Sequence, residues 1–443
     1  MITHTDDEWQ ALQRDLVALR QQITDLTAQL TAAQQRIAEL EAKKTPPPAF
    51  VKANRPPKAA QPRTPRAPEQ NRSRRRDTPT VIVAHPITQC PACQGRLSSR
   101  HVGRRRQVID VPPPPPVLVT EHQVERGWCS YCHAWRDAPL DLTGQVVGQG
   151  RLGVGLAGLV VHLRQVVRAP IRVIQQWLAS VHGVQLSVGA ITDLLRRVAA
   201  RGQAAALQIR DRLRTRAVVH ADETGWREAG RNGYIWELAS TSGDRYFEYH
   251  HSRAGAVIQG LLGPDFSGVL VTDFYAGYND TPGGRHQRCW VHLLRDLHTL
   301  KEEHPLAIEV RAWAMAVKDL YERARQITGP PEERARRVEE VNDEMTSLAE
   351  HAAAARGHPC QALARRLLRH QGELFRFALD PAIPADNHQA ERGIRPLVVT
   401  RKISGGSRSP QGSTTRMTLA SLVQTWMAHG LNPLEEVRRL FQT

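Results

Sequence analysis

Three acidic residues stand in distinctive sequence contexts that lie far apart along the chain. Asp222 lies in His-Ala-Asp-Glu-Thr-Gly-Trp, Asp273 in Thr-Asp-Phe-Tyr-Ala-Gly-Tyr, and Glu391 in Asp-Asn-His-Gln-Ala-Glu-Arg. Two metal ions about 3.5–4 Å apart can activate an attacking oxygen and stabilise a leaving one in phosphodiester chemistry. Mg²⁺ prefers oxygen ligands and keeps several waters, so a few converging carboxylates suffice to hold it. The three residues are therefore candidate catalytic residues and candidate Mg²⁺ ligands.

The alternative for each aspartate is an ordinary turn or capping role at the end of a strand. Other acidic residues are plentiful in the same region, for example Glu223, Asp244 and Asp265. Around Glu391, the spacing favours a functional role. Asn387 precedes it by four residues and Arg395 follows it by four, so all three share one helix face. An ion pair with Arg395 could then orient the Glu391 carboxylate.

The segment that must position these residues alternates between short strands and helices. Residues 217–221 and 268–272 are apolar runs that end at Asp222 and Asp273, and the carboxyl ends of strands are where open α/β sheets place their sites. The pattern predicts a mixed sheet with helices on its faces over residues 213–430, with a helical insertion at about 296–380. Further expected elements are strands at 234–239 and 246–249, a helix at 254–262, and a last helix that starts near Asp386 or Asn387 and ends at Pro396.

Residues 150–212 are expected to form a helical domain. An amphipathic helix over 171–182 ends at Gly183, and Ser187 can cap a second helix over 188–200 that ends before Gly202. A helix, a glycine turn and a helix resemble a DNA-binding helix-turn-helix. An ordinary connection in a helical bundle is the alternative.

Four of the six cysteines form two Cys-x-x-Cys pairs, Cys90 with Cys93 and Cys129 with Cys132. Two such pairs complete a tetrahedral structural Zn²⁺ site, which suits a zinc ribbon over residues 81–140 with a strand near 117–124. Zinc would then replace a core that this segment is too small to build.

A third cysteine, Cys289, stands three residues before His292 and six before Arg295. Cys289 and His292 could bind metal, but two ligands are too few for a stable site. A structural or DNA-positioning role is the preferred interpretation of this motif.

Residues 6–42 are expected to form a coiled coil, because apolar residues recur with a strict period of 3.5. The seam comprises Trp9, Leu12, Leu16, Leu19, Ile23, Leu26, Leu30, Ala33, Ile37 and Leu40. A self-association helix is the favoured interpretation, and an amphipathic helix packed on its own domain is the alternative. Residues 43–80 follow with nine prolines, eleven lysines and arginines and two acidic residues. That composition predicts an extended linker, which either keeps the protein soluble or contacts phosphates without regard to sequence.

The formal net charge of +16 points to a polyanionic partner, either nucleic acid or an anionic membrane surface. No run of 18 apolar residues is present, so a membrane-spanning helix is not expected. The acidic N-terminus lacks a signal-peptide pattern, and a cytoplasmic protein is expected. The region around Glu391 is basic, which is typical of phosphate contacts or, alternatively, of a solvated face. The candidate DNA-binding residues are Arg392, Arg395, Arg401, Lys402 and Arg408.

Taken together, the contexts of Asp222, Asp273 and Glu391, with the Cys-Trp-Val-His motif at 289–292, resemble the large transposase of the insertion sequence 66 family. The resemblance runs from about residue 9 to the end. It implies a ribonuclease H-like catalytic fold, an Asp-Asp-Glu triad on these residues and two Mg²⁺ ions, with Mn²⁺ as an alternative. It also implies a bacterial, nucleoid-associated protein that acts on element ends and target DNA, with accessory proteins from the same element.

Two other interpretations stay open. The first is a two-metal nuclease that cleaves DNA without strand transfer. The second is a non-catalytic, zinc-ribbon DNA-binding protein derived from a transposase. Three carboxylates placed beside phosphates disfavour the second, because they repel DNA unless metal ions bind them.

Overall fold

The computed structural model describes residues 19–31, 35, 76–114 and 117–442. The chain divides into two compact units, Met1–Asp110 and Val111–Thr443. No helix in the described part of the chain has both the length and the apolar character that a membrane crossing requires.

In the first unit, residues 19–31 are helical, as the heptad pattern predicts. Leu19, Ile23, Leu26 and Leu30, which belong to the predicted seam, are all more than half exposed. The remaining parts of the predicted coiled coil, apart from residue 35, and residues 43–75 of the predicted linker lie outside the described residues. Residues 76–110 contain no helix or strand, and Cys90 to Gly95 form a tight loop closed by the Gln94 N–H donating to the Cys90 carbonyl at 2.8 Å.

The second unit begins with a two-stranded antiparallel hairpin, β1 (Arg126–Cys129) and β2 (Ala134–Asp137). The rings of Trp128 and Trp135 meet edge to face across it, 5.9 Å apart. The strand expected at 117–124 is therefore wrong. The hairpin forms instead around the turn that holds Cys129 and Cys132, because residues 117–124 have no described strand to pair with.

Three helices follow, α2 (Val154–Gln165), α3 (Ile171–His182) and α4 (Val188–Arg214). The predicted cap is confirmed, since the Ser187 hydroxyl accepts a hydrogen bond from the Ala190 N–H at 3.0 Å. The predicted end before Gly202 is wrong, because α4 continues through this glycine to Arg214. A Cβ at Gly202 would lie 2.4 Å from a methyl of Leu422, so this glycine allows close packing of two helices rather than ending one.

The central element is a five-stranded mixed sheet with the order β5-β4-β3-β6-β7. Strands β3, β4 and β5 form an antiparallel meander, whereas β6 and β7 run parallel to β3. The predicted strands in this region are confirmed, with shifted ends. Their bounds are β3 Val218–Glu228, β4 Arg231–Ala239, β5 Arg245–His250, β6 Val269–Thr272 and β7 His286–Arg288, with helix α5 at Gly255–Leu262 and a 3₁₀ turn at Ala276–Tyr278.

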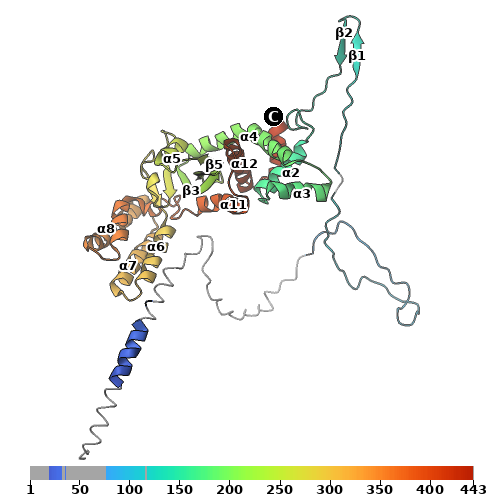
Figure 1. The fold of residues 1–443 in the computed structure, drawn as a ribbon. Helices are drawn as coiled ribbons and strands as arrows, with labels where there is room; N and C mark the ends of the chain where they lie inside the picture. Colours follow the sequence, from blue (N-terminus) through green and yellow to red (C-terminus); the bar gives the residue numbers. More distant parts are fainter. Residues whose placement is uncertain (1–18, 32–34, 36–75, 115–116, 443) are drawn as a thin grey trace, which may run out of the picture. The chain divides into compact units, whose positions relative to one another are not determined.

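Each face of the sheet is covered by helices, because successive side chains of a strand point to opposite faces. Val219 and Ala221 of β3 belong to the core that α4 and α5 cover. Trp226 packs with Leu397 of α11 (His388–Ser404) and Met417 of α12 (Pro410–Ala428). Figure 1 shows α4, α11 and α12 gathered around β3 and β5. The even-numbered side chains of β3, including Asp222, therefore face α11.

Helix α12 also closes the free edge of the sheet at β5. The Ser421 hydroxyl accepts from the Phe247 N–H at 2.8 Å, and the Thr425 hydroxyl bonds the N–H and carbonyl of Arg245. An exposed edge strand can pair with another chain. The two hydroxyls form hydrogen bonds with backbone groups of β5 that would otherwise be free for such pairing. The last helix, α13 (Pro433–Gln442), packs on α2, so the C-terminus completes the core of the helical segment.

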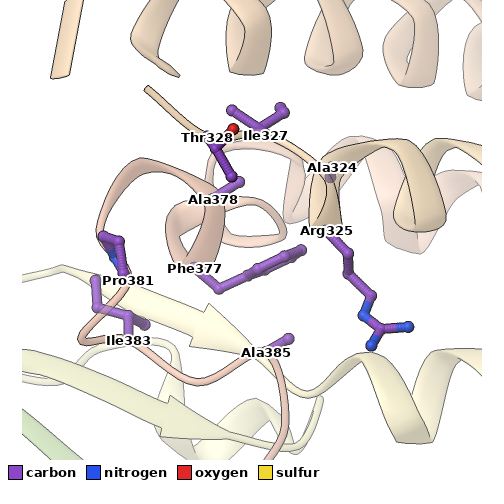
Figure 2. A pocket seen from close by; sticks show the side chains of 9 residues that line it. All are labelled: Ala324, Arg325, Ile327, Thr328, Phe377, Ala378, Pro381, Ile383 and Ala385. Atoms are coloured by element: carbon purple, nitrogen blue, oxygen red, sulfur yellow. The ribbon is translucent and has the colours of Figure 1, made fainter. Parts of the chain in front are cut away.

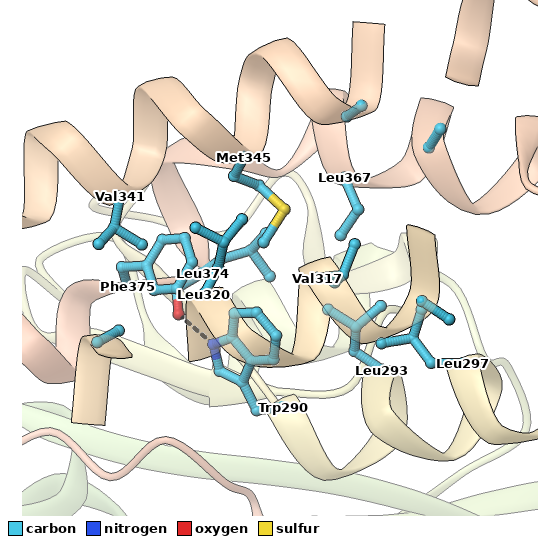
Figure 3. Close-up of a cluster of buried hydrophobic side chains, with 14 of the residues drawn as sticks. Trp290, Leu293, Leu297, Val317, Leu320, Val341, Met345, Leu367, Leu374 and Phe375 are labelled. Carbon is cyan, nitrogen blue, oxygen red and sulfur yellow. Dashed lines mark hydrogen bonds between the residues drawn. The ribbon is translucent and has the colours of Figure 1, made fainter. Parts of the chain in front are cut away.

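Between β7 and α11 the chain forms a helical insertion with its own apolar core, as predicted (Figure 3). Trp290 lies at its base, fully buried, and its indole N–H donates to the Leu374 carbonyl at 2.6 Å. The Tyr321 ring stacks on Trp290 at 4.6 Å. The helices are α6 Trp290–Glu303, α7 Ile308–Arg325, α8 Pro331–Ala354, α9 Gln361–Arg369 and α10 Arg376–Leu379, with a 3₁₀ turn at Gln371–Glu373.

Candidate active site

The strand register brings two of the predicted acidic residues together. In the parallel pair β3–β6, Val218 lies opposite Val269 and His220 lies opposite Val271. Continued by two residues, this register aligns Asp222 with Asp273. Val269 and Val271 pack in a small cluster with Ile383, on the face opposite to Leu270. By the alternation of side chains, Asp222 and Asp273 thus project from neighbouring strands toward the same face.

Asp222 does not end its strand, contrary to the sequence expectation. Strand β3 continues through Glu228, because β4 pairs with it along its whole length beyond Val218 and Val219. Only the parallel pairing with β6 stops at His220. Asp222 therefore lies just past the end of β6, where a strand neighbour is present on one side alone. Asp273 does follow β6 directly, as predicted.

The carboxyl of Asp222 is electrostatically unfavourable when charged. Its pKa is raised to about 8, first by burial and then by the negative charges of Glu223, Asp273 and Glu391. A single hydrogen bond from the Glu223 N–H, 2.9 Å long, favours the charged form. Coulombic coupling to both Asp273 and Glu391 means that all three predicted carboxylates share one neighbourhood.

Glu223, next to Asp222, has a different environment. It forms an ion pair with Arg253 and accepts a hydrogen bond from the Tyr278 hydroxyl. The Arg253 guanidinium also lies over the Tyr275 ring, 3.8 Å from its centre. A carboxylate with these partners is neutralised by the protein itself, so Glu223 is a poorer cation ligand than its neighbour.

Asp273 is held in place through hydrogen bonds to its backbone carbonyl as well as to its carboxylate. The buried guanidinium of Arg288 donates to the Asp273 carbonyl at 3.0 Å and to the Thr272 hydroxyl at 3.2 Å. Arg288 is paired in turn with Glu373 at 2.6 Å. One Asp273 carboxylate oxygen accepts from the Tyr275 N–H at 2.9 Å. The loop after β6 is thus fixed from inside the protein.

Asn387 joins the helix that carries Glu391 to the strand that carries Asp222. Its side-chain amide donates to the Ala221 carbonyl at 2.8 Å, and its side-chain oxygen lies 3.1 Å from His220 Nδ1. Because that oxygen only accepts, His220 must carry its proton on Nδ1. Burial lowers the pKa of His220 to about 4, so the ring is neutral. The predicted helix start is confirmed, but the Asn387 side chain bonds β3 instead of capping α11.

Helix α11 runs through Pro396 to Ser404, so the predicted break at this proline is wrong. Its Gly393 is required for packing. A Cβ there would lie 1.8 Å from Glu237 Oε1 and 1.9 Å from Arg245 Nη1. Glu237 and Arg245 form a buried ion pair at 2.8 Å, and the Arg245 guanidinium also donates to the Gln389 carbonyl at 2.8 Å. This pair supports the first turn of α11 beneath Glu391.

Cys289 lies where the loops of the site meet. Its N–H donates to the Thr272 carbonyl at 2.8 Å, and its Sγ accepts from the Asn387 N–H at 3.2 Å. These bonds link the residue before Asp273 to the N-cap of the helix that carries Glu391. Burial raises the pKa of the Cys289 thiol. Arg295 of the same motif is exposed on α6.

Glu391 is the partner of His292 rather than of Arg395. His292 Nε2 lies 3.7 Å from Glu391 Oε1, whereas Arg395 is exposed. The Glu391 Oε1 atom is buried and has no hydrogen-bond partner. One ligand atom each from Cys289, His292 and Glu391 lies within 4.8 Å of the others. Sequence reasoning counted only two ligands here, because the third comes from a helix that is distant along the chain.

The predicted DNA-binding residues differ in their surroundings. Arg392, Arg395, Lys402 and Arg408 are exposed. Arg401 instead contacts β3, donating to the Thr224 hydroxyl at 3.2 Å and to the Gly225 carbonyl. Its role in the structure is to fix α11 on the strand of Asp222.

The two Cys-x-x-Cys pairs lie in different units, and each forms a compact turn. Backbone N–H groups of Cys93 and then Ala92 lower the pKa of Cys90. Those of Cys132 and then Tyr131 lower the pKa of Cys129, and the Cys132 N–H lies 3.4 Å from Cys129 Sγ. Both turns favour the thiolate, the form that binds metal.

A cavity of about 330 Å³ opens beside the insertion (Figure 2). Phe377, Ile383 and Ala385 line it together with Arg325 at the end of α7. None of the three predicted carboxylates lines it, and it is mainly apolar. The three carboxylates are therefore separate from this cavity.

Several supporting residues were not identified from the sequence. They are His220, Arg288, Glu237 and Arg245, all of which act through contacts between distant segments. A signal existed for His220, since it stands two residues before Asp222 and must share its face of the strand. The others are placed by tertiary contacts that no local pattern encodes.

Comparison with known proteins agrees with the motifs around this site. The family described as Transposase IS66 family matches residues 149–415, a segment that contains Asp222, Asp273 and Glu391. The uncharacterized protein y4qI of Sinorhizobium fredii is 25% identical over 290 residues, which cover 57% of this chain and 52% of that protein. The uncharacterized protein y4jO of the same organism is 29% identical over 175 residues, which cover 39% and 51%. The chain spans about half the length of these curated relatives. Since the family match covers more than half of the chain, the protein belongs to the IS66 transposase family.

Proposed function

We propose that the protein is a DNA transposase in which Asp222, Asp273 and Glu391 form the catalytic triad. The observation that carries this proposal is the β3–β6 register, which ends at His220 opposite Val271 and, extended by two residues, aligns Asp222 with Asp273 on the face covered by α11. The electrostatic coupling of Asp222 to Asp273 and Glu391 supports it. The family membership of the segment that contains all three residues supports it as well.

The donor set fits Mg²⁺, with Mn²⁺ as an alternative. All three side chains offer carboxylate oxygens, and Glu391 Oε1 is buried without a hydrogen-bond partner. The raised pKa of Asp222, caused first by burial and then by the charges of Glu223, Asp273 and Glu391, supports a site that a bound cation would stabilise. Asp222 and Asp273 would hold two ions, and Glu391 would complete the shell of one. When bound, the ions activate the attacking oxygen and stabilise the leaving oxygen of the phosphodiester.

The proposed reaction comprises two in-line transfers at this one site. Water attacks a phosphodiester at an end of the element, and the bond from phosphorus to the 3′ oxygen breaks and frees a 3′ hydroxyl. That hydroxyl then attacks a phosphodiester of the target DNA, and a new phosphorus–oxygen bond replaces the broken one. The protein contributes position and charge: Asn387 and Arg288 fix the two backbone segments, and the exposed arginines near Glu391 contact phosphates.

The sheet supports a ribonuclease H-like fold for this domain. An antiparallel meander of three strands is followed by two strands parallel to the first, in the order β5-β4-β3-β6-β7. The carboxylates come from the first strand of the meander, from the end of the fourth strand and from a later helix. That is the arrangement the sequence resemblance implies.

The remaining modules are proposed to bring DNA and a second copy of the chain to this site. The exposed apolar positions of residues 19–31 suit a coiled-coil dimer, which would pair two DNA ends. Cys90 and Cys93 in one turn and Cys129 and Cys132 in the other are proposed as ligands of structural Zn²⁺, and the lowered pKa values of Cys90 and Cys129 suit that role. The helical segment α2–α4 and the linker are proposed to add DNA contacts.

Strand transfer in vitro tests the proposal. Purified protein, Mg²⁺ and labelled DNA that carries the sequences flanking the gene are incubated with a target plasmid. Joined products are expected for the wild type and not for Asp273→Asn. Asp265→Asn is the matched control, since Asp265 is an exposed aspartate outside the proposed triad.

Three results would change the proposal. Nicking without joining, lost in Asp273→Asn, would favour a two-metal nuclease or a requirement for an accessory protein. Equal joining by Asp273→Asn and the wild type would remove Asp273 from the triad. DNA binding without any metal-dependent cleavage would favour a non-catalytic DNA-binding protein.

A further inference from the structure

The contact between α6 and α11 beside the proposed triad combines three different kinds of metal ligand. Cys289 is the N-cap of α6, His292 lies in its first turn, and Glu391 lies in the first turn of α11. Their thiol, imidazole and carboxylate atoms lie within 4.8 Å of one another. The motif at 289–292 therefore has a third ligand that its sequence does not contain.

We propose that Cys289, His292 and Glu391 bind a thiophilic divalent cation of the Zn²⁺ type. A sulfur, a nitrogen and a carboxylate oxygen are the donors that Zn²⁺ selects, whereas Mg²⁺ and Ca²⁺ select oxygen alone. Three protein ligands with an open fourth position are typical of exchangeable zinc sites.

The state of the ligand atoms supports the site. Glu391 Oε1, the atom that faces His292, is buried and accepts no hydrogen bond. His292 Nδ1 is also buried and has no hydrogen-bond partner. The distance of 3.7 Å between His292 Nε2 and Glu391 Oε1 is too long for a hydrogen bond. In a tetrahedral zinc site, the same two atoms lie about 3.4 Å apart, given bond lengths near 2.1 Å. Small side-chain rotations are enough to bring them to that separation.

Cys289 is already oriented for such a role. Its Sγ accepts the Asn387 N–H at 3.2 Å, and its own N–H is bonded to Thr272. The Asn387 N–H fixes the position of the sulfur, and a bound divalent cation would displace its proton. The anchors keep the sulfur near Glu391 without neutralising Glu391 itself.

This site shares Glu391 with the proposed triad, and the following consequence rests on that proposed function. A Zn²⁺ ion held by Cys289 and His292 takes up the Glu391 carboxylate, which leaves one ligand fewer for Mg²⁺. Zinc is therefore expected to inhibit Mg²⁺-dependent cleavage through His292 and Cys289.

The test measures binding without DNA, so its outcome is independent of transposase activity. The metal-free full-length chain is titrated with Zn²⁺ against a chromophoric chelator, and with Co²⁺ as a spectroscopic probe of thiolate ligation. The wild type is expected to bind one more equivalent than His292→Gln, or to bind that equivalent at least about tenfold more tightly. His298→Gln is the matched control, because His298 is an exposed histidine on the same helix.

A second readout assigns the ion to Cys289. Cys289 and Cys360 are both fully buried, so they serve as a matched pair within one protein. Alkylation of each thiol during slow local opening is followed by mass spectrometry. Zn²⁺ is expected to slow alkylation of Cys289 and to leave Cys360 unchanged, and His292→Gln removes that protection.

His292→Gln decides the question even if Cys289→Ser fails to fold, since the His292 side chain is 29% exposed and its replacement leaves the apolar core intact. Equal stoichiometry and equal affinity in His292→Gln and the wild type would overturn the proposal and assign all bound zinc to the Cys-x-x-Cys pairs. If binding is lost but zinc inhibits cleavage by His292→Gln as strongly as by the wild type, the shared use of Glu391 is wrong.

Discussion

The sheet that carries Asp222 and the helical insertion that follows it have opposite kinds of interior. The sheet region buries ionisable side chains almost completely, namely His220, Glu237, Asp244, His286 and Arg288. The described core of the insertion is apolar throughout, and His370 at its border is the buried polar residue of helices α6 to α10. The insertion is therefore stabilised mainly by packing, whereas the stability of the sheet also depends on the protonation of its buried ionisable groups.

The difference has a physical cause. Carboxylates that converge at one place repel one another when they are charged. The supporting ion pairs, such as Glu237 with Arg245, must then be buried beneath it to hold the segments in place. The insertion has no such demand, and its core is built from apolar contacts.

The largest effect on stability is expected in the insertion. Trp290→Ala removes a fully buried ring, its stacking on Tyr321 and its hydrogen bond to Leu374. A loss of about 3–5 kcal/mol in the free energy of unfolding is expected, measured by urea denaturation. Met315→Ala on α7, where the side chain is 64% exposed, is expected to change stability by less than about 0.5 kcal/mol. Similar losses in both variants would show that the insertion core is not the source of stability.

Asp222→Asn is expected to increase the free energy of unfolding, whereas Trp290→Ala decreases it. The pKa of Asp222 is raised to about 8, so between pH 4 and pH 8 the unfolded chain ionises this carboxyl while the metal-free fold keeps it protonated, and stability falls as the pH rises through that range. Asparagine cannot ionise in either state and keeps an acceptor for the Glu223 N–H. At pH 7 without divalent cations the variant is expected to be more stable than the wild type by on the order of 2–4 kcal/mol.

Two further observations check that interpretation of Asp222. The advantage of Asp222→Asn is expected to disappear near pH 4, where the wild-type carboxyl is protonated in both the folded and the unfolded state. Mg²⁺ is expected to raise the melting temperature of the wild type more than that of the variant. Asp265→Asn, at an exposed position, is the control. A destabilised Asp222→Asn at pH 7 would mean that the protein neutralises this carboxylate by itself.

His286 has the opposite effect on the pH dependence of stability, because it lowers stability as the pH falls. Burial, followed by the charge of Arg288, lowers its pKa to about 4. The unfolded chain takes up the proton near pH 6.5, so folding is progressively disfavoured as the pH falls from about 6.5 to about 4. Over this range His286→Gln is expected to gain on the order of 3 kcal/mol relative to the wild type, measured by urea denaturation at each pH. His298→Gln, at an exposed histidine, should show no such gain.

The same contrast explains which features were predictable from the sequence. The strands and the helical region of the insertion follow local hydrophobic patterns and are found where they were expected, although β3 continues past its expected end at residue 221 to Glu228. The expected ends at Gly202 and Pro396 are wrong, because packing of α4 on α12 and of α11 on the sheet continues both helices through residues that are locally unfavourable. Local propensity is a weak guide wherever a long apolar face is buried.

At the site, the sequence could indicate the carboxylates but not the tertiary contacts that fix their positions. Asp222, Asp273 and Glu391 stand in distinctive contexts, and their roles stay predictions. The Asn387 side chain was placed on the Glu391 face by its i, i+4 spacing, but its bonds to Ala221 and His220 depend on how α11 crosses β3. Glu391 as a third partner of the Cys289 motif depends on the same crossing.

The smallest effect tests whether the buried charges beneath Glu391 are as tightly packed as the geometry indicates. Gly393→Ala places a methyl within 2 Å of both Glu237 Oε1 and Arg245 Nη1, so a loss of about 1–3 kcal/mol is expected. Gly260→Ala in α5 is the matched control, because a Cβ there meets no atom within 4 Å. Alanine is the better helix former, so Gly260→Ala is expected to stabilise the protein by about 0.5–1 kcal/mol. If both substitutions stabilise the protein, the ion pair can move aside, and it does not fix the helix that carries Glu391.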